Sequence, residues 1–194
     1  MAMVDPFSLD QYLARRKLLT FITPKFYIYD TMDNLVAYVE QKAFRLKEEI
    51  TIFGDEQKQQ ALLLIKARQI IDFSAAYDVT DARTGEKVGA LRRKGWKSLL
   101  RDEWLLLDAA DQPFGRLQED STLLAVLRRF LSNLIPQTYQ IEINGQPAGE
   151  IKQHFNPFVL KHTVDLRADP GRRLDRRLAL AAVVLLQAIE GRQD

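Results

Sequence analysis

The residues from Leu178 to Ile189, LALAAVVLLQAI, form an apolar run that Gln187 alone interrupts. A helix over this run is apolar around its whole circumference, so it must be surrounded on every side instead of packing along one stripe. Lipid is one such environment, but a spanning helix needs about 20 apolar residues and this run rises only about 18 Å. We therefore expect the helix to lie inside the protein, with a membrane span as the weaker alternative.

We predict one helix over residues 172–189, preceded by the turn residues Asp169, Pro170 and Gly171 and ended by Gly191. Its first turns carry Asp175 and a set of arginines, namely Arg172, Arg173, Arg176 and Arg177. Arginines at a helix N-terminus oppose the helix macrodipole. Their placement indicates that an anion or acidic side chains lie nearby.

Most of the remaining chain alternates between apolar and polar residues, which is the pattern of half-buried strands. About twelve short segments fit this pattern, at residues 18–22, 26–30, 35–41, 49–53, 61–67, 76–81, 87–94, 103–109, 113–118, 138–143, 147–153 and 158–166. Such regular spacing is typical of a sandwich or barrel. A closed barrel of this size is wider than the roughly eight-stranded kind that side chains alone fill, so a helix about 10 Å across is a suitable plug.

The strands also repeat a pattern in which a strand, a turn, a second strand, an aromatic residue and a third strand follow one another. The matching positions in the first strand of each unit are Ile28, Val79 and Ile141. We expect each unit to form a bent meander.

Two further helices are predicted. Residues 8–16 form a short helix with Ser8 as its N-cap, and residues 121–134 form an amphipathic helix that Pro136 ends. We expect residues 1–194 to form a single domain.

The composition excludes several kinds of site. The chain of 194 residues has no cysteine, which excludes disulfides, thiolate catalysis and cysteine-based zinc sites. Its net charge of +2 is too small to indicate nucleic-acid binding. The N-terminal residues carry Asp5 and Asp10 and lack the apolar run of a secretory signal, so we expect a cytoplasmic protein.

No catalytic motif is present. His154 and His162 are the only histidines, and neither belongs to a zinc-protease or nucleophile-elbow pattern. We expect no catalytic residues, no cofactor and no bound metal. An enzyme with a pocket at one end of the barrel, where a histidine lies beside a carboxylate, is the less favoured alternative.

Two basic clusters are the candidate ligand-binding residues. The first surrounds Trp96 in RRKGWKSLLR and consists of Arg92, Arg93, Lys94, Lys97 and Arg101. The second lies at the start of the predicted C-terminal helix and consists of Arg172 and Arg173. Cations beside an interfacial tryptophan suit anionic lipid headgroups. The alternative is a solvated loop with Trp96 in the core.

Two stretches and the late apolar helix resemble the LURP-one-related family, which belongs with the phospholipid scramblases and the tubby C-terminal domain. The stretches are ITPKFYIYDTMDNLVAYVEQKAFRLKEEITIFGDE and YDVTDARTGEKVGALRRKGWKSLLRDEWLLLDA, and the likeness runs over about residues 18–190. The resemblance implies a mainly β fold: a twelve-stranded closed β-barrel around a central hydrophobic C-terminal helix.

The functional residues of that superfamily do not transfer to this chain. Scramblases place an acidic calcium-binding segment before the last helix, and the matching stretch here has Asp165, Asp169 and Asp175 diluted by arginines. It lacks the closely alternated carboxylates that calcium prefers. No phosphoinositide-binding motif of the tubby proteins can be matched residue by residue.

We therefore predict a non-enzymatic, cytoplasmic binding module that recognises an anionic phospholipid at a membrane surface. The alternative is a structural or protein-interaction protein that self-associates or binds a partner without a lipid ligand.

Overall fold

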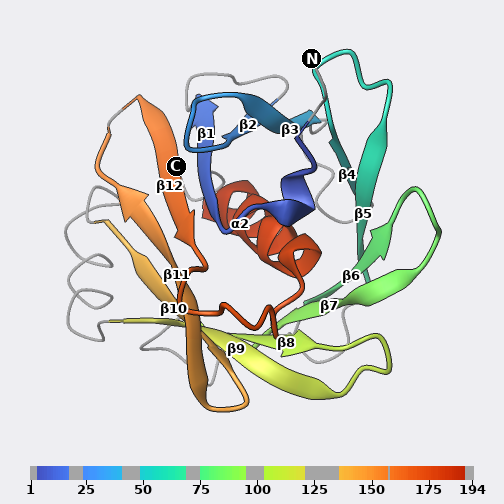
Figure 1. Ribbon diagram of the computed structural model, residues 1–194, viewed down its shortest axis with the longest axis vertical. Coiled ribbons are helices and arrows are strands. Elements are labelled where there is room, and N and C mark those ends of the chain that lie inside the picture. Colours follow the sequence, from blue (N-terminus) through green and yellow to red (C-terminus); the bar gives the residue numbers. More distant parts are fainter. Residues whose placement is uncertain are drawn as a thin grey trace.

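The structure, a computed structural model, describes residues 4–17, 24–40, 49–68, 75–94, 103–120, 136–156 and 158–190. A 3₁₀ turn, η1 (Pro6–Ser8), precedes twelve strands and one helix (Figure 1). The elements are β1 (Gln11–Lys17), β2 (Lys25–Tyr29), β3 (Leu35–Glu40), β4 (Glu49–Phe53), β5 (Ala61–Ala67), β6 (Ala76–Asp81), β7 (Lys87–Arg93), β8 (Glu103–Leu107), β9 (Pro113–Glu119), β10 (Thr138–Ile143), β11 (Gln146–His154), β12 (Val159–Asp165) and α2 (Arg176–Glu190).

The strands form one closed barrel in which each strand pairs antiparallel with its neighbours in sequence, and β1 pairs with β12 to close the ring. Side chains alternate between the inner and outer faces, as the burial of every second residue of β10 and β12 shows. The predicted fold class, a mainly β closed barrel of twelve strands, is confirmed.

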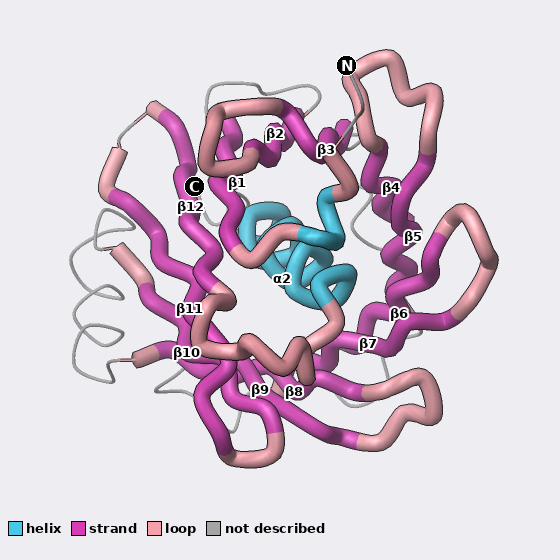
Figure 2. Tube along the Cα trace, in the orientation of Figure 1, coloured by secondary structure: helices cyan, strands magenta, loops and turns pink. Residues whose placement is uncertain are grey.

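The helix α2 runs through the centre of the ring of strands (Figures 1 and 2). From Leu178 to Ala188 each of its side chains is at most 2% exposed, including Gln187. The expectation that sheet surrounds this helix is confirmed. In the ranges that the structure describes, no helix is both long and apolar enough to span a bilayer.

One predicted helix is absent, and the predicted start of another is wrong. Residues 8–16 form no helix: the chain makes η1 and then enters β1, in which Tyr12, Ala14 and Arg16 alternate inward. The central helix begins at Arg176 and not at residue 172, because Asp175 caps it with a side-chain bond of 2.8 Å from the backbone N–H of Arg177. The predicted strand at 18–22 and helix at 121–134 lie outside the described residues.

Bulges lie at the three matching positions of the predicted repeat, and the register also shifts after Ile52 and Leu106. The register of the strand pairs shifts directly after Ile28, Val79 and Ile141. The residue opposite Ile141 is Gly149, where a Cβ atom would lie 2.4 Å from the carbonyl oxygen of Asp165. A bulge bends the strand and increases its twist, which helps each meander curve around α2.

We name the two ends of the barrel after the start and the finish of α2. The near end is where α2 begins, and it holds the turns at residues 30–34, 54–60, 82–86, 108–112 and 144–145 and the segment 166–175. The far end is where α2 finishes, and it holds the turn between β11 and β12. The other connections at the far end fall largely outside the described residues.

Candidate functional site

At the near end, the buried Asp169 organises the start of α2. Its carboxylate accepts hydrogen bonds from the backbone N–H of Arg173 at 3.1 Å, the backbone N–H of Leu174 at 2.9 Å and the guanidinium of Arg176 at 2.9 Å. Burial raises the pKa of Asp169, but these hydrogen bonds outweigh burial and hold the pKa at about 2. Asp169 is therefore the acidic partner that the arginines of this helix require.

The two arginines that open α2 each lie between carboxylates. Arg176, which is only 3% exposed, contacts Asp10 at 2.7 Å in addition to its bond with the carboxylate described above. Arg177 contacts Asp175 at 2.7 Å and the buried Asp81 at 3.2 Å. The unfavourable position of these arginines near the helix N-terminus is thus offset by protein carboxylates, without an external anion.

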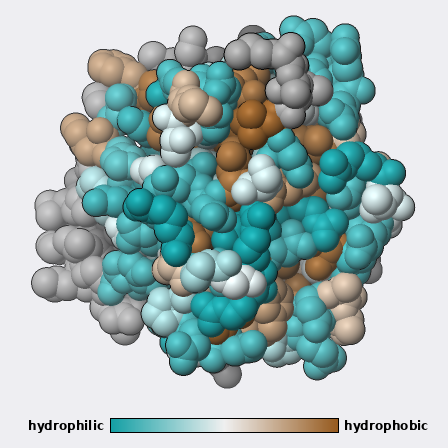
Figure 3. All heavy atoms as spheres, viewed as in Figure 1, coloured by the Kyte–Doolittle hydropathy of each residue, from teal (hydrophilic) through white to brown (hydrophobic). Residues whose placement is uncertain are grey.

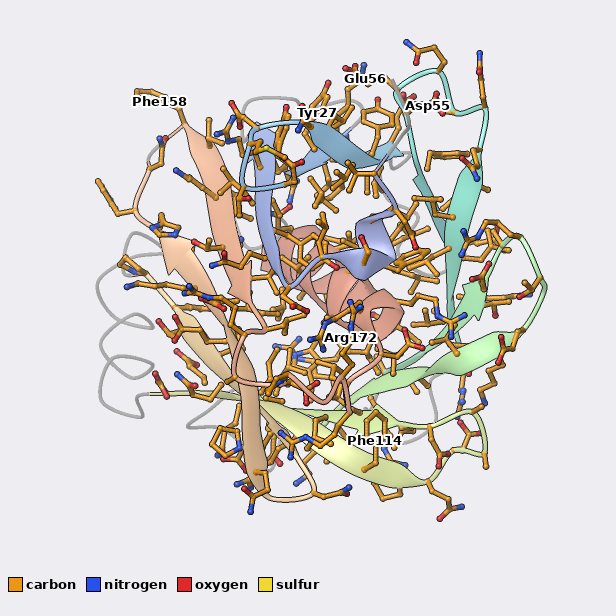
Figure 4. All side chains as sticks on the ribbon, in the orientation of Figure 1. Tyr27, Asp55, Glu56, Phe114, Phe158 and Arg172 are labelled. Carbon is orange, nitrogen blue, oxygen red and sulfur yellow. The ribbon has the colours of Figure 1, made fainter. Side chains whose placement is uncertain are left out.

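The two near-end residues proposed from the sequence as ligand-binding belong to the same network. Arg173 donates to Asp169 at 2.9 Å and to the carbonyl oxygen of Pro147 at 2.9 Å. Arg172 lies over the start of α2 (Figure 4), donates to the carbonyl oxygen of Phe7 at 2.8 Å and is 3.8 Å from Asp10. Both residues therefore tie the segment before α2 to the barrel.

The far end of α2 has the opposite polarity. Arg16 of β1, 7% exposed, donates from its guanidinium to the carbonyl oxygen of Gln187 at 2.7 Å. A cation at the C-terminal turn of a helix complements its macrodipole. The side-chain amide of Gln187 lies 3.2 Å from Nδ1 of His162, which faces the helix from β12. The single polar residue in the apolar run is the sequence signal for this buried cluster.

The other predicted cluster ends β7, at the far end. The guanidinium of Arg93 lies 5.9 Å from the centre of the Trp104 ring, and Lys94 contacts Glu103 at 2.6 Å. Arg92 lies on the opposite face of β7 from Arg93 and, within the described ranges, makes no ion pair. Lys97 and Arg101, together with Trp96, lie outside the described residues. The structure thus separates the two predicted clusters by the length of the barrel.

A further far-end surface, which the sequence reading missed, lies around the turn between β11 and β12. Phe155 is 59% exposed and Phe158 is 65% exposed. Lys152 and Lys161 lie on the outer faces of the two strands, with His154 paired opposite Lys161. Two phenylalanines close together in a stretch with lysines and few carboxylates were the available signal. We call these five residues the β11–β12 tip.

The histidines do not form a shared site. His162 is buried inside the barrel, whereas His154 is on the outer face and contacts the hydroxyl of Thr163. Burial and then the charges of Lys161 and Lys152 lower the pKa of His154. Among the residues that the structure describes, no group of histidines and carboxylates could hold a metal ion.

An apolar groove of about 540 Å³ lies at the near end, and Figure 3 shows apolar side chains gathered on this face of the molecule. It lies between η1, the start of β3 and the hairpin of β4 and β5; its apolar lining includes Val4, Pro6, Met32, Leu35, Val36 and Leu62.

The cation at the rim of this groove, Arg83, contacts the buried Asp81 at 3.1 Å and lies over the ring of Phe7. Burial raises the pKa of Asp81, but hydrogen bonds from Arg83 and Arg177 outweigh burial and bring the pKa to about 2. Arg83 therefore has a structural partner already, and the groove is mainly apolar in character.

Comparison with known proteins gives one match. The model of the family described as LURP-one-related matches residues 35–187, which run from β3 to the last turns of α2 and cover most of the chain. No curated protein and no solved structure matches the chain.

Proposed function

We propose, from the premise that this chain belongs to the LURP-one-related family, that it binds anionic phospholipid surfaces through the far end of its barrel. The family suggests a non-catalytic binding module. The lipid ligand is inferred from the charges at the far end.

One observation carries the proposal: the cations at the two ends differ in their partners. At the near end Arg173, Arg176 and Arg177 contact carboxylates at 2.9 Å or less. At the far end Lys94 contacts Glu103, but Arg92 and Lys152 form no ion pair within the part of the chain that the structure describes. A cation without a protein carboxylate keeps its full attraction for anionic headgroups, about 1 kcal/mol for each lysine or arginine near the surface.

A vesicle sedimentation assay tests the proposal at about 0.15 M salt, where unpaired charges more than about 8 Å apart are screened. Vesicles of phosphatidylcholine alone are compared with vesicles containing about one-quarter phosphatidylserine. We expect binding to the anionic vesicles only. A variant with Arg92→Ala, Lys152→Ala and Lys161→Ala should bind about a hundredfold more weakly.

A control variant with Arg116→Ala, Arg167→Ala and Arg172→Ala removes the same charge from cations that contact Glu142, Asp165 and Asp10. Its affinity should change by less than about threefold. If both variants lost the same vesicle affinity, the binding would depend on net charge alone and not on the far end. Absence of binding by the unmodified protein would reject the lipid proposal in favour of a protein-interaction role.

A further inference from the structure

We propose that the β11–β12 tip is a membrane anchor, with Phe155 and Phe158 inserting at the headgroup level of an anionic bilayer while Lys152 and Lys161 contact the headgroups. This inference rests on the proposed lipid-binding function and assigns it a contact surface.

The two phenylalanine side chains are exposed without serving the core. Val4, Met32, Phe155 and Phe158 are the large apolar side chains that the described residues leave exposed, and only the last two are aromatic. Figure 4 shows Phe158 at the edge of the molecule, pointing away from the barrel. Phenylalanine is among the apolar side chains that interfacial segments bury at the boundary between headgroups and acyl chains, without deep insertion.

A side-chain acceptor fixes the backbone of Phe158 and of the start of β12. The side-chain oxygen of Asn156 accepts hydrogen bonds from the backbone N–H of Phe158 at 2.9 Å and of Val159 at 3.0 Å. Phe158 is thereby held next to β12, which pairs with β11 in the barrel wall. Backbone held in this way loses little conformational entropy when it docks.

The charges behind the phenylalanines favour a bilayer over a neutral apolar partner. Lys152 and Lys161 flank His154 closely enough to help lower its pKa, so positive charge is concentrated there. The nearest acidic pair across these strands, Glu150 and Asp165, lies towards the near end. Apolar residues at a tip with lysines behind them match the polarity gradient of an anionic membrane surface, where lysine stems can snorkel to the headgroups.

The absence of cysteine from the sequence makes a site-specific test direct. Phe158→Cys and, as the matched control, Met32→Cys at the near end are each labelled with an environment-sensitive fluorophore. Met32 is 75% exposed, so both labels start in water. On vesicles containing phosphatidylserine, we expect the label at position 158 to shift to the blue and to be quenched by spin-labelled acyl chains. The label at position 32 should do neither.

A second variant measures affinity without a label. Phe155→Ser with Phe158→Ser should weaken binding to the anionic vesicles by about tenfold or more, because the apolar contact is lost while the lysines remain. The control Met32→Ser should change it by less than about twofold. Phe155, Phe158 and Met32 are all exposed in the protein alone, so unfolding transitions should be unchanged in both variants.

The outcomes separate this inference from the proposed function. If the unmodified protein binds anionic vesicles but the serine variant binds equally well and the label at position 158 stays unquenched, the tip is no anchor although lipid binding stands. If the unmodified protein does not bind these vesicles, both proposals are rejected. If light scattering shows a self-associated protein that the serine variant makes monomeric, the tip is a protein contact and the anchor is rejected.

Discussion

The near end and the far end of the barrel both carry arginines and lysines, but the carboxylates around them differ. At the near end Asp169 and Asp81 are buried beneath Arg176 and Arg177, and the cations complete a network that fixes the start of α2. At the far end Arg92 and the lysines of the β11–β12 tip lie on the outer wall. Basic clusters that look alike in a sequence therefore separate into structural and exposed classes according to whether the fold buries a carboxylate beside them.

The difference also explains why the helix can be buried with charges at both of its ends. Carboxylates, Asp169 and Asp175, lie at its N-terminus, and the guanidinium of Arg16 lies at its C-terminal turn. Both placements complement the helix macrodipole. The near-end arginines neutralise the buried carboxylates and leave little net charge for a ligand to recognise.

The largest effect is expected when the near-end network loses its centre. Asp169→Ala leaves the buried guanidinium of Arg176 with one carboxylate fewer and the backbone N–H of Leu174 without its acceptor. Breaking a buried pair in this way should lower the free energy of unfolding by about 3–5 kcal/mol. Urea unfolding followed by circular dichroism measures the change. In the control Asp33→Asn, which removes an exposed charge partner of Arg15 and keeps a side chain that tolerates the positive φ at this position, the loss should stay below about 1 kcal/mol.

Acidification should also lower the free energy of unfolding through the near-end carboxylates. The loss for each group should be smaller than the loss in Asp169→Ala. The pKa values of Asp169 and Asp81 are about 2 in the folded protein, below the value of about 3.9 expected for an unfolded aspartate. Their contribution is therefore fully present above about pH 5 and is lost as the pH falls towards 2, at about 2–3 kcal/mol for each group. Urea unfolding between these pH values should show the decline, and Asp169→Asn should flatten it. An unchanged slope in that variant would contradict the role given to Asp169.

The exposed ion pair of the near-end network should contribute much less to the free energy of unfolding than the buried Asp169 does. Arg172 is 3.8 Å from Asp10 and its side chain is 45% exposed, so the pair is well solvated. Arg172→Ala should lower the free energy of unfolding by about 0.2–1 kcal/mol and leave vesicle binding unchanged. Loss of vesicle binding in this variant, with stability preserved, would place a lipid contact at the near end and break the contrast between the two ends.

The smallest effect on stability is expected at the far end. Lys152→Ala should change the free energy of unfolding by less than about 0.5 kcal/mol, because the side chain is exposed and makes no ion pair among the described residues. The same variant should weaken binding to anionic vesicles by about fivefold. A large loss of stability would show that this lysine is structural like the near-end arginines.

Much of the barrel could be predicted because its signals are local. The alternation of apolar residues placed β5, β6 and β10 at their observed bounds, and the repeat at Ile141 corresponds to a bulge. The strand β1 could not be found in this way. Its sequence, QYLARRK, contains good helix formers, and the inward position of Arg16 hides the alternation. Only pairing with β2 and β12 makes this segment a strand.

The candidate site was predictable only in part. The sequence indicated Arg92 and Arg172 alike as candidate ligand-binding residues, because a run of cations shows charge but not the partners of each charge. It used Phe155 only as the aromatic residue of the third repeat unit and Phe158 only as the first residue of a predicted strand, because apolar residues beside a strand are usually part of the core. Their exposure follows from the place where the turn leaves the barrel wall.

The sequence by itself favoured burial of α2 in protein over a membrane span, because the apolar run has no polar face and is too short for a bilayer. It also determined that strands of regular spacing enclose the helix. Only the tertiary structure decided which charges are neutralised. Asp10 and Arg176 are separated by 166 positions in the chain and meet only when β1 closes the barrel over the start of α2. Such a pairing leaves no local pattern, because it depends on closure of the ring and not on the spacing of neighbouring residues.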